Sequence, residues 1–233
     1  MKKSRIWLLV YGVTAMGVIA ASLLCSRTVA VIAENTPIEG RSCIVIDPGH
    51  GGIDGGAVSC TGRPESGYNL EISLRLRDLL HFLGYRTKMT RTTDVSVYTE
   101  GQTIAQKKLS DLRHRVQMIR EEEQALVLSI HQNQFADSRY TGAQVFYGTT
   151  PGSKALARRL QCGFRETVGS TRREKQAAGV YLMEHLPCTG VLIECGFLSN
   201  PQEEAMLRDP GYQKKLCCVI AAAVGQYLLD PAL

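Results

Sequence analysis

Several common signatures of function are missing from this sequence of 233 residues. Its eight cysteines form no Cys-x-x-Cys pair, so neither a zinc knuckle nor a thioredoxin-type redox site is indicated. There is no His-Glu-x-x-His, no Gly-x-Gly-x-x-Gly, and no glycine loop ending in Lys and Ser or Thr. We find no internal repeat and no low-complexity segment. The function must therefore be sought in residues that are far apart along the chain.

The chain also lacks a concentration of charge in its main part. It has 27 basic and 22 acidic residues, a formal charge of +5. Without Lys2, Lys3, Arg5 and Arg27, 23 basic residues face the same 22 acidic ones. Nucleic-acid binding needs a concentrated basic face. No nucleic-acid partner is predicted.

The N-terminus has the pattern of a targeting segment. Lys2, Lys3 and Arg5 precede an uncharged apolar run over 6–24, and small-residue patterns suited to cleavage follow at 28–33. The run is also about long enough to span a bilayer, so an uncleaved membrane anchor stays open. Residues 1–33 are predicted to be a signal peptide or an N-terminal anchor, and 34–41 a linker. Either way, the working part is exported outside the cytoplasmic membrane.

Export would permit disulfides, with Cys60, Cys162 and Cys188 as the candidate partners. Cys43, Cys195, Cys217 and Cys218 lie in apolar runs, where cysteine behaves as a small hydrophobic residue. We predict that most of the cysteines are buried free thiols.

Strand-like and helix-like segments alternate along the rest of the chain. Strands are predicted at 43–47, 85–90, 125–130, 144–147, 180–183 and 190–193. Helices are predicted at 66–83, from a cap at Ser110 or Asp111 onward, at 153–168 and at 212–229, with a loop over 91–106. This alternation predicts a single α/β domain with a mostly parallel, twisted sheet and helices on both faces.

Polar residues end three of the apolar strands or follow them closely. His50 lies in the glycine-rich loop after the first strand, His131 follows 125–130, and Glu194 follows 190–193. Glu65 opens the first helix directly after the loop that carries His50. Open α/β sheets place ligands at the carboxyl ends of their strands. Two imidazoles and a carboxylate would suit a hydrolytic zinc site, and a further carboxylate would suit its base.

Each residue also has a structural interpretation. His131 alone would be a core histidine, and Glu65 alone would favour its helix through the helix dipole. Glu194 is costly at the end of a buried strand unless it is paired, which favours a functional role. Asn133 would orient substrate or close a turn, and Asn200 is predicted to be a turn residue. Asp47 would support a ligand histidine or cap the loop. Arg115 would steady the site from its helix or lie on the surface, and the surface position is the one predicted.

Five segments, in this order, resemble the zinc-dependent N-acetylmuramoyl-L-alanine amidases. They are IDPGHGG, Glu65 with the helix NLEISLRLRDLL, TRTTD, SIHQN and LIECGFLSN. The resemblance covers roughly residues 42 to 229. The details YLMEH and ECGFLSNPQEEAML look most like the germination-specific, CwlD-type branch.

The resemblance implies that residues 42–230 are an amidase catalytic domain. His50, Glu65 and His131 would bind Zn²⁺, and Glu194 would be the catalytic carboxylate. The substrate would be peptidoglycan, in the cell wall or the forespore intermembrane space. The branch implies formation of muramic δ-lactam in spore cortex together with a deacetylase, and an activating lipoprotein is a further candidate partner. A zinc carboxypeptidase or endopeptidase, or an inactive wall-binding regulator, are the alternatives.

Overall fold

The computed structural model describes residues 42–231, which belong to one compact unit. The expected leader (1–33) and linker (34–41) lie outside the described residues. The strands are β1 (Ile44–Pro48), β2 (Thr87–Met89), β3 (Leu126–Asn133), β4 (Gln144–Tyr147), β5 (Lys175–Gln176) and β6 (Thr189–Phe197). The helices are α2 (Glu65–Phe82), α3 (Ile104–Arg120), α4 (Ser153–Val168), α5 (Tyr181–His185), α6 (Pro201–Arg208) and α7 (Pro210–Leu229).

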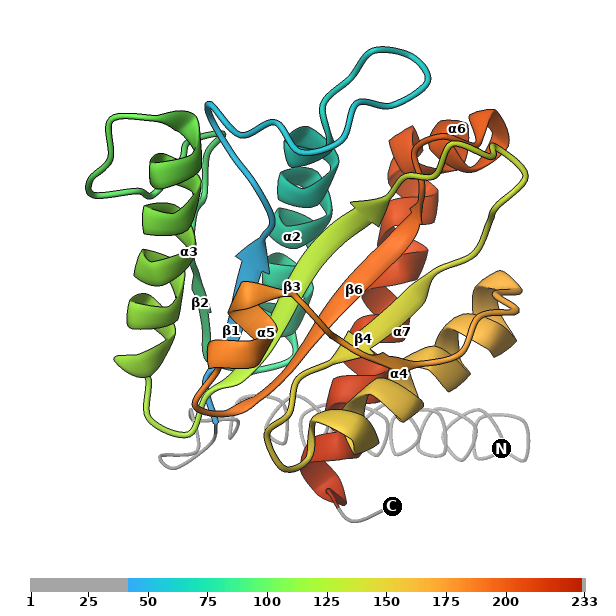
Figure 1. Ribbon diagram of the computed structural model, residues 1–233. Coiled ribbons are helices and arrows are strands. Elements are labelled where there is room, and N and C mark those ends of the chain that lie inside the picture. Colours follow the sequence, from blue (N-terminus) through green and yellow to red (C-terminus); the bar gives the residue numbers. More distant parts are fainter. Residues whose placement is uncertain (1–41, 232–233) are drawn as a thin grey trace, which may run out of the picture. The chain divides into compact units, whose positions relative to one another are not determined.

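The strands form one sheet in the order β2-β1-β3-β6-β4-β5 (Figure 1). Neighbouring strands run parallel except at the pairing of β4 with β6. The last strand along the chain, β6, therefore lies inside the sheet, between β3 and β4. The carboxyl ends of β1, β3 and β6 all point to the same edge, which is the edge that carries the candidate site.

The apolar strands of the sheet are covered on both faces. Ile44 and Ile46 of β1 belong to the larger core cluster, which also contains the buried faces of α2, α4 and α7. Val45, between them, belongs to a second cluster with α3 and α5. Alternate residues of a strand point to opposite faces, so helices lie on both sides (Figure 1). The predicted fold class, a single α/β domain with a mostly parallel sheet, is confirmed.

The start of α3 differs from the prediction. The helix begins at Ile104 with a capping box, in which the Thr103 hydroxyl accepts from the backbone N–H of Gln106 and the Gln106 side chain accepts from the backbone N–H of Thr103. The predicted caps Ser110 and Asp111 lie inside the helix and bind the preceding loop. Ser110 Oγ accepts from the backbone N–H of Thr99 at 3.1 Å. These two residues therefore fix the crossing loop onto α3.

Residues 180–183 were predicted to be a strand, which is wrong, because the short helix α5 begins at Tyr181. Strand β5 and helix α6 were not predicted. Helix α6 begins at a Pro after the cap Asn200, whose side chain accepts from the N–H groups of Gln202 and Glu203. The prediction that Asn200 belongs to a turn is thus confirmed.

The seven described cysteines are all free thiols. Cys43, Cys195 and Cys217 are buried as predicted, whereas Cys218 is exposed on α7. The prediction that most of the cysteines are buried is wrong for the described residues, since only these three of the seven are. Among residues 42–231, no helix is both long enough and apolar enough to cross a membrane.

Candidate active site

The sheet brings together polar groups from three strands and one helix. His50 follows β1, while His131 of β3 and Glu194 of β6 are register partners. Glu65, the first residue of α2, reaches the same edge because its backbone N–H donates to the Ala57 carbonyl at 2.8 Å. The structure therefore gathers the four residues that the sequence singled out.

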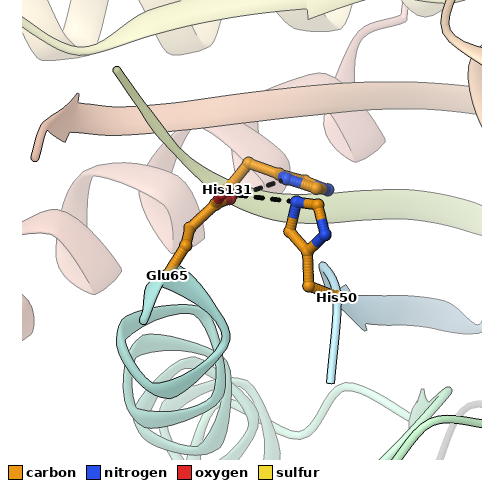
Figure 2. A group of neighbouring side chains, drawn as sticks. All are labelled: His50, Glu65 and His131. Atoms are coloured by element: carbon orange, nitrogen blue, oxygen red, sulfur yellow. Dashed lines mark hydrogen bonds and ion pairs between the residues drawn. The ribbon is translucent and has the colours of Figure 1, made fainter. Parts of the chain in front are cut away.

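His50, Glu65 and His131 form the closest group. Each offers one ligand atom, and these atoms all lie within 4.8 Å of one another. Glu65 lies between the two rings, with Oε1 2.9 Å from Nδ1 of His131 and Oε2 3.3 Å from Nε2 of His50 (Figure 2). Two imidazoles and a carboxylate are a donor set that catalytic zinc uses, with a fourth position left for water. The three residues fit a metal ion of this kind.

The Glu65 carboxylate is held by backbone and side-chain donors. The N–H of Ala57 donates to Oε2 at 3.0 Å, while Asn69 Nδ2 and the N–H of Gln132 donate to Oε1 at 3.0 and 3.1 Å. Burial raises the pKa of Glu65, but its hydrogen bonds to the two histidines outweigh this and lower the pKa overall. Gly56 passes so close that a Cβ there would lie 2.6 Å from Oε2. The carboxylate is therefore ionised and fixed in place, as a metal ligand must be.

His50 is oriented by an acidic neighbour. Its φ of 60° lies in the left-handed region, which residues other than glycine seldom adopt. Nδ1 of His50 lies 3.0 Å from Asp54 Oδ2, and Asp54 Oδ1 lies 2.8 Å from Lys108 Nζ. Burial lowers the pKa of His50, but hydrogen bonds to Asp54 and Glu65 outweigh it and raise the pKa to about 9. Carboxylate partners of this kind fix the ring and tautomer of a ligand histidine.

Sequence reasoning missed Asp54. Its signal was its position, an acid four residues after His50 in the same glycine-rich loop. The sequence instead offers Asp47, at the end of the first predicted strand, as a candidate partner for a ligand histidine.

Two buried arginines hold the backbone of the His50 loop. Arg115 donates from Nη1 to the Pro48 carbonyl at 2.8 Å and from Nη2 to the His50 carbonyl at 2.7 Å. Arg91, from the TRTTD segment, donates from Nε to the Pro48 carbonyl and from Nη2 to the Gly49 carbonyl, both at 2.9 Å. The prediction of a surface Arg115 is wrong, since the residue is only 2 % exposed. Three consecutive carbonyls are thus fixed by two guanidinium groups.

Asp47 belongs to the same buried network. It accepts from Thr90 Oγ1 and Ser129 Oγ at 2.7 Å each and from Arg115 Nη1 at 2.6 Å. Burial raises the pKa of Asp47, but Arg115 and the two hydroxyls outweigh burial and lower the pKa to about 2. Its carboxylate is used by these three donors and supports the loop through Arg115. The interpretation of Asp47 as partner of a ligand histidine is therefore wrong.

Of the two carboxylates among these four residues, Glu194 is the one with an unused oxygen. Its Oε2 is buried and has no hydrogen-bond partner among the described residues. Burial raises the pKa of Glu194 to about 7, with the charge on His131 lowering it and the charge on Glu65 raising it. A carboxylate with a pKa near neutrality is suited to proton transfer. An orphan polar atom beside a ligand set is also a reason to expect a bound molecule there.

A cleft of about 350 Å³ opens beside the two histidines, between α3 and α5. Its apolar wall consists of Leu112, Val180, Tyr181, Leu182 and Leu192. Lys108, Asp54 and Asp111 add charged groups to the lining. An apolar cleft with a few polar groups next to titratable residues is the usual form of a small-molecule site.

Asn133 ends β3, where its carbonyl accepts from the N–H of Leu198 at 2.8 Å. Its backbone thereby joins the ends of β3 and β6. A role for its side chain in orienting substrate stays a prediction.

The fold and the site define the class: a mostly parallel α/β domain with a candidate hydrolytic metal centre at the carboxyl edge of its sheet. The chain belongs to the Amidase_3 family, whose model is described as N-acetylmuramoyl-L-alanine amidase and matches residues 44–226. The family resemblance predicted from the motifs is confirmed.

Individual relatives agree with this assignment. The chain is 38% identical over 198 residues to the germination-specific N-acetylmuramoyl-L-alanine amidase of Bacillus subtilis (strain 168), covering 83% of this chain and 82% of that relative. It is 27% identical over 195 residues to the probable cell wall amidase LytH of Staphylococcus epidermidis (strain ATCC 12228 / FDA PCI 1200), covering 83% of this chain but only 60% of LytH. Among solved structures, the CwlD amidase from Clostridioides difficile in complex with the GerS lipoprotein matches with a TM-score of 0.78 and 36% identity, over 81% of this chain and 99% of that one.

Proposed function

We propose that this protein hydrolyses the amide bond between N-acetylmuramic acid and L-alanine in peptidoglycan. His50, Glu65 and His131 would hold Zn²⁺, and Glu194 would be the catalytic carboxylate. One observation supports this most: a compact group of three ligand atoms lies beside a separate, half-buried carboxylate whose Oε2 is buried and has no hydrogen-bond partner among the described residues. Membership of the Amidase_3 family supports the choice of bond.

When bound, zinc supplies a Lewis acid for the substrate carbonyl and lowers the pKa of a water molecule. The residues of the chain supply the rest. With the metal bound, Asp54 would hold the remaining proton of His50 on Nδ1, which would leave Nε2, on the side of Glu65, for the metal. Oε2 of Glu194 accepts a proton from the attacking water and passes it to the amide nitrogen, because an amine anion is a poor leaving group.

Mass spectrometry of peptidoglycan digested by the purified protein tests this proposal. We expect free lactyl groups on muramic acid and free amino termini on L-alanine. Intact muramoyl–alanine bonds would exclude an amidase. Cleavage inside the stem peptide would instead identify a carboxypeptidase or endopeptidase. Lack of any cleavage in the presence of stoichiometric zinc would identify a wall-binding regulator.

We also propose that the protein acts in spore cortex maturation, where its reaction precedes formation of muramic δ-lactam by a deacetylase. The similarity to a germination-specific amidase supports this role. Residues 1–33 would export the protein, or anchor it in the membrane if they are not cleaved, 34–41 would be the linker, and 42–230 the catalytic domain. The GerS complex of the similar C. difficile amidase supports a lipoprotein partner. Cortex without the lactam in a deletion strain would support the role, and unchanged cortex would refute it.

A further inference from the structure

A cluster of aromatic side chains lies partly exposed at the edge of the sheet that carries the candidate site. Phe135 and Tyr140 lie in the segment between β3 and β4, and Phe197 ends β6. The ring centroid of Phe135 lies 5.0 Å from that of Tyr140 and 5.6 Å from that of Phe197. Phe197 is fully buried, whereas Phe135 is 50% and Tyr140 44% exposed. We call the two exposed rings, Phe135 and Tyr140, the aromatic platform. The buried ring of Phe197 packs beneath them.

The platform is built into the fold. The guanidinium of Arg172 lies 5.1 Å from the Tyr140 ring centroid and 4.8 Å from that of Phe197, and its Nε donates to the Thr141 carbonyl at 2.9 Å. The N–H of Phe135 donates to Ser199 Oγ at 3.2 Å. Farther along the same segment, Asn200 Nδ2 donates to the Ser138 carbonyl at 2.7 Å, which ties the segment to the start of α6 (Figure 1). Large apolar groups held in place at the surface are a feature of binding sites.

The platform lies close to the proposed catalytic residues. Phe135 follows His131 by four residues, so their Cα atoms are at most about 14 Å apart. Phe197 follows Glu194 by three residues, which limits that distance to about 11 Å. The cleft is lined by residues of β1, β3, β6, α3 and α5 and includes none of the three aromatic residues, whereas the platform lies at the ends of β3 and β6. The site therefore has an apolar cleft on one flank and exposed aromatic rings on another.

An amide that joins a sugar to a peptide must extend in two directions from the cleaved bond. Pyranose rings present a flat face of C–H groups, which packs on aromatic rings. Phe135 offers an aromatic ring of this kind and no polar group. Tyr140 adds a hydroxyl that can exchange hydrogen bonds with sugar hydroxyls. An aromatic pair held in place therefore suits the saccharide side of the substrate, and the cleft between α3 and α5 suits the peptide side.

We infer that Phe135 and Tyr140 bind a flanking saccharide ring of the glycan strand, a neighbour of the N-acetylmuramic acid that carries the cleaved bond, while the stem peptide enters the cleft between α3 and α5. This inference rests on the proposed amidase function for the identity of the substrate. One of its two measurements does not depend on hydrolysis, so the saccharide-binding inference and the amidase proposal can fail separately.

The first measurement is binding of the full-length protein to glycan strands from which all stem peptides have been removed. These strands hold no amide that the enzyme is proposed to cut. We expect the double variant Phe135→Ala/Tyr140→Ala to bind about tenfold more weakly. Phe135→Trp, which keeps an aromatic face, should bind as the unchanged protein does. Tyr140→Phe keeps the ring but loses the hydroxyl, so it should bind more weakly than the unchanged protein and more tightly than the double variant. Phe82→Ala is the matched control, because Phe82 is 86% exposed at the far end of α2 from Glu65.

The second measurement compares hydrolysis of polymeric peptidoglycan with that of a soluble muramoyl peptide that has a single sugar. The double alanine variant should raise KM for the polymer about tenfold and leave kcat unchanged. Its KM for the single-sugar substrate should stay within about twofold of the original. Unchanged glycan binding in the double variant would overturn the inference. An equal loss on both substrates would also overturn it, because that result would indicate a structural role for the rings. If the unchanged protein binds glycan but hydrolyses neither substrate, and the double variant loses that binding, only the amidase proposal is refuted.

Discussion

Glu194 and His131 face each other as register partners on the parallel strands β6 and β3. The pairing places the carboxylate beside the ligand group but leaves it outside the three atoms that lie within 4.8 Å of one another. Ligand binding and proton transfer are therefore assigned to different side chains, and substitutions should separate them.

Glu194→Gln should retain zinc and lose activity. The amide is nearly the same size as the carboxylate but cannot accept the proton of water, so kcat should fall by about 10²–10⁴-fold. Metal content by mass spectrometry and kcat on peptidoglycan fragments check this. A variant that loses its metal would show that Glu194 is a ligand.

His131→Ala should lose the metal, because only two of the three ligands remain. Metal content after dialysis, followed by a zinc titration, measures the loss. His81→Ala is the matched control, because His81 is exposed near the end of α2. Equal metal content in both variants would contradict the assignment of His131.

Arg115→Ala should destabilise the fold, because it leaves Asp47 as an unpaired buried charge. Breaking a buried pair in this way costs about 3–5 kcal/mol in free energy of unfolding, measured by urea denaturation. Arg115→Lys keeps the charge but loses the planar fork that reaches both Pro48 and His50. We expect that variant to stay folded with zinc affinity reduced about 10–100-fold.

Arg113→Ala, at an exposed position of the same helix, is the control for both variants of Arg115. It should change neither stability nor affinity measurably. Unchanged zinc affinity in a folded Arg115→Lys protein would refute the positioning role.

The Asp47 carboxylate should make stability depend on pH in acid. Its pKa is lowered from 3.8 to about 2 in the folded protein, so its contribution is present above about pH 4 and is lost as the pH falls toward 2. The size is about 2 kcal/mol, from 1.36 kcal/mol per unit of pKa. Free energies of unfolding are measured at several pH values for the original protein and Asp47→Asn. The difference between the two proteins should change by this amount between about pH 4 and pH 2. Parallel curves would refute it.

The sequence allowed much of the fold to be predicted because its strands are continuous apolar runs between turn residues, as in 125–130. Short segments were harder. The stretch 180–183 is apolar enough for a strand, yet tertiary packing of Leu182 and Met183 against α3 makes it a helix. The cap of α3 was misplaced because both Thr103 and Ser110 are suitable caps in sequence, and only the loop that packs on Ser110 decides between them.

The site was predicted in part for a similar reason. Strand ends identified His50, His131 and Glu194 as a set, because parallel strands bring their carboxyl ends together. Arg115 could not be assigned in this way. Whether an arginine on an amphipathic helix faces solvent or a buried loop depends on which carbonyls lie behind it. That information exists only once β1 and α3 have packed together.

The position of β6 between β3 and β4 has a consequence for how the protein is made. All three proposed zinc ligands lie before residue 132, whereas Glu194 comes from the strand that is translated last and inserted into the middle of the sheet. A growing chain therefore contains all three proposed ligands before it contains its proposed proton acceptor. Under the roles proposed above, the protein becomes an active peptidoglycan hydrolase only after nearly the whole polypeptide has been synthesised and exported and β6 has inserted into the sheet.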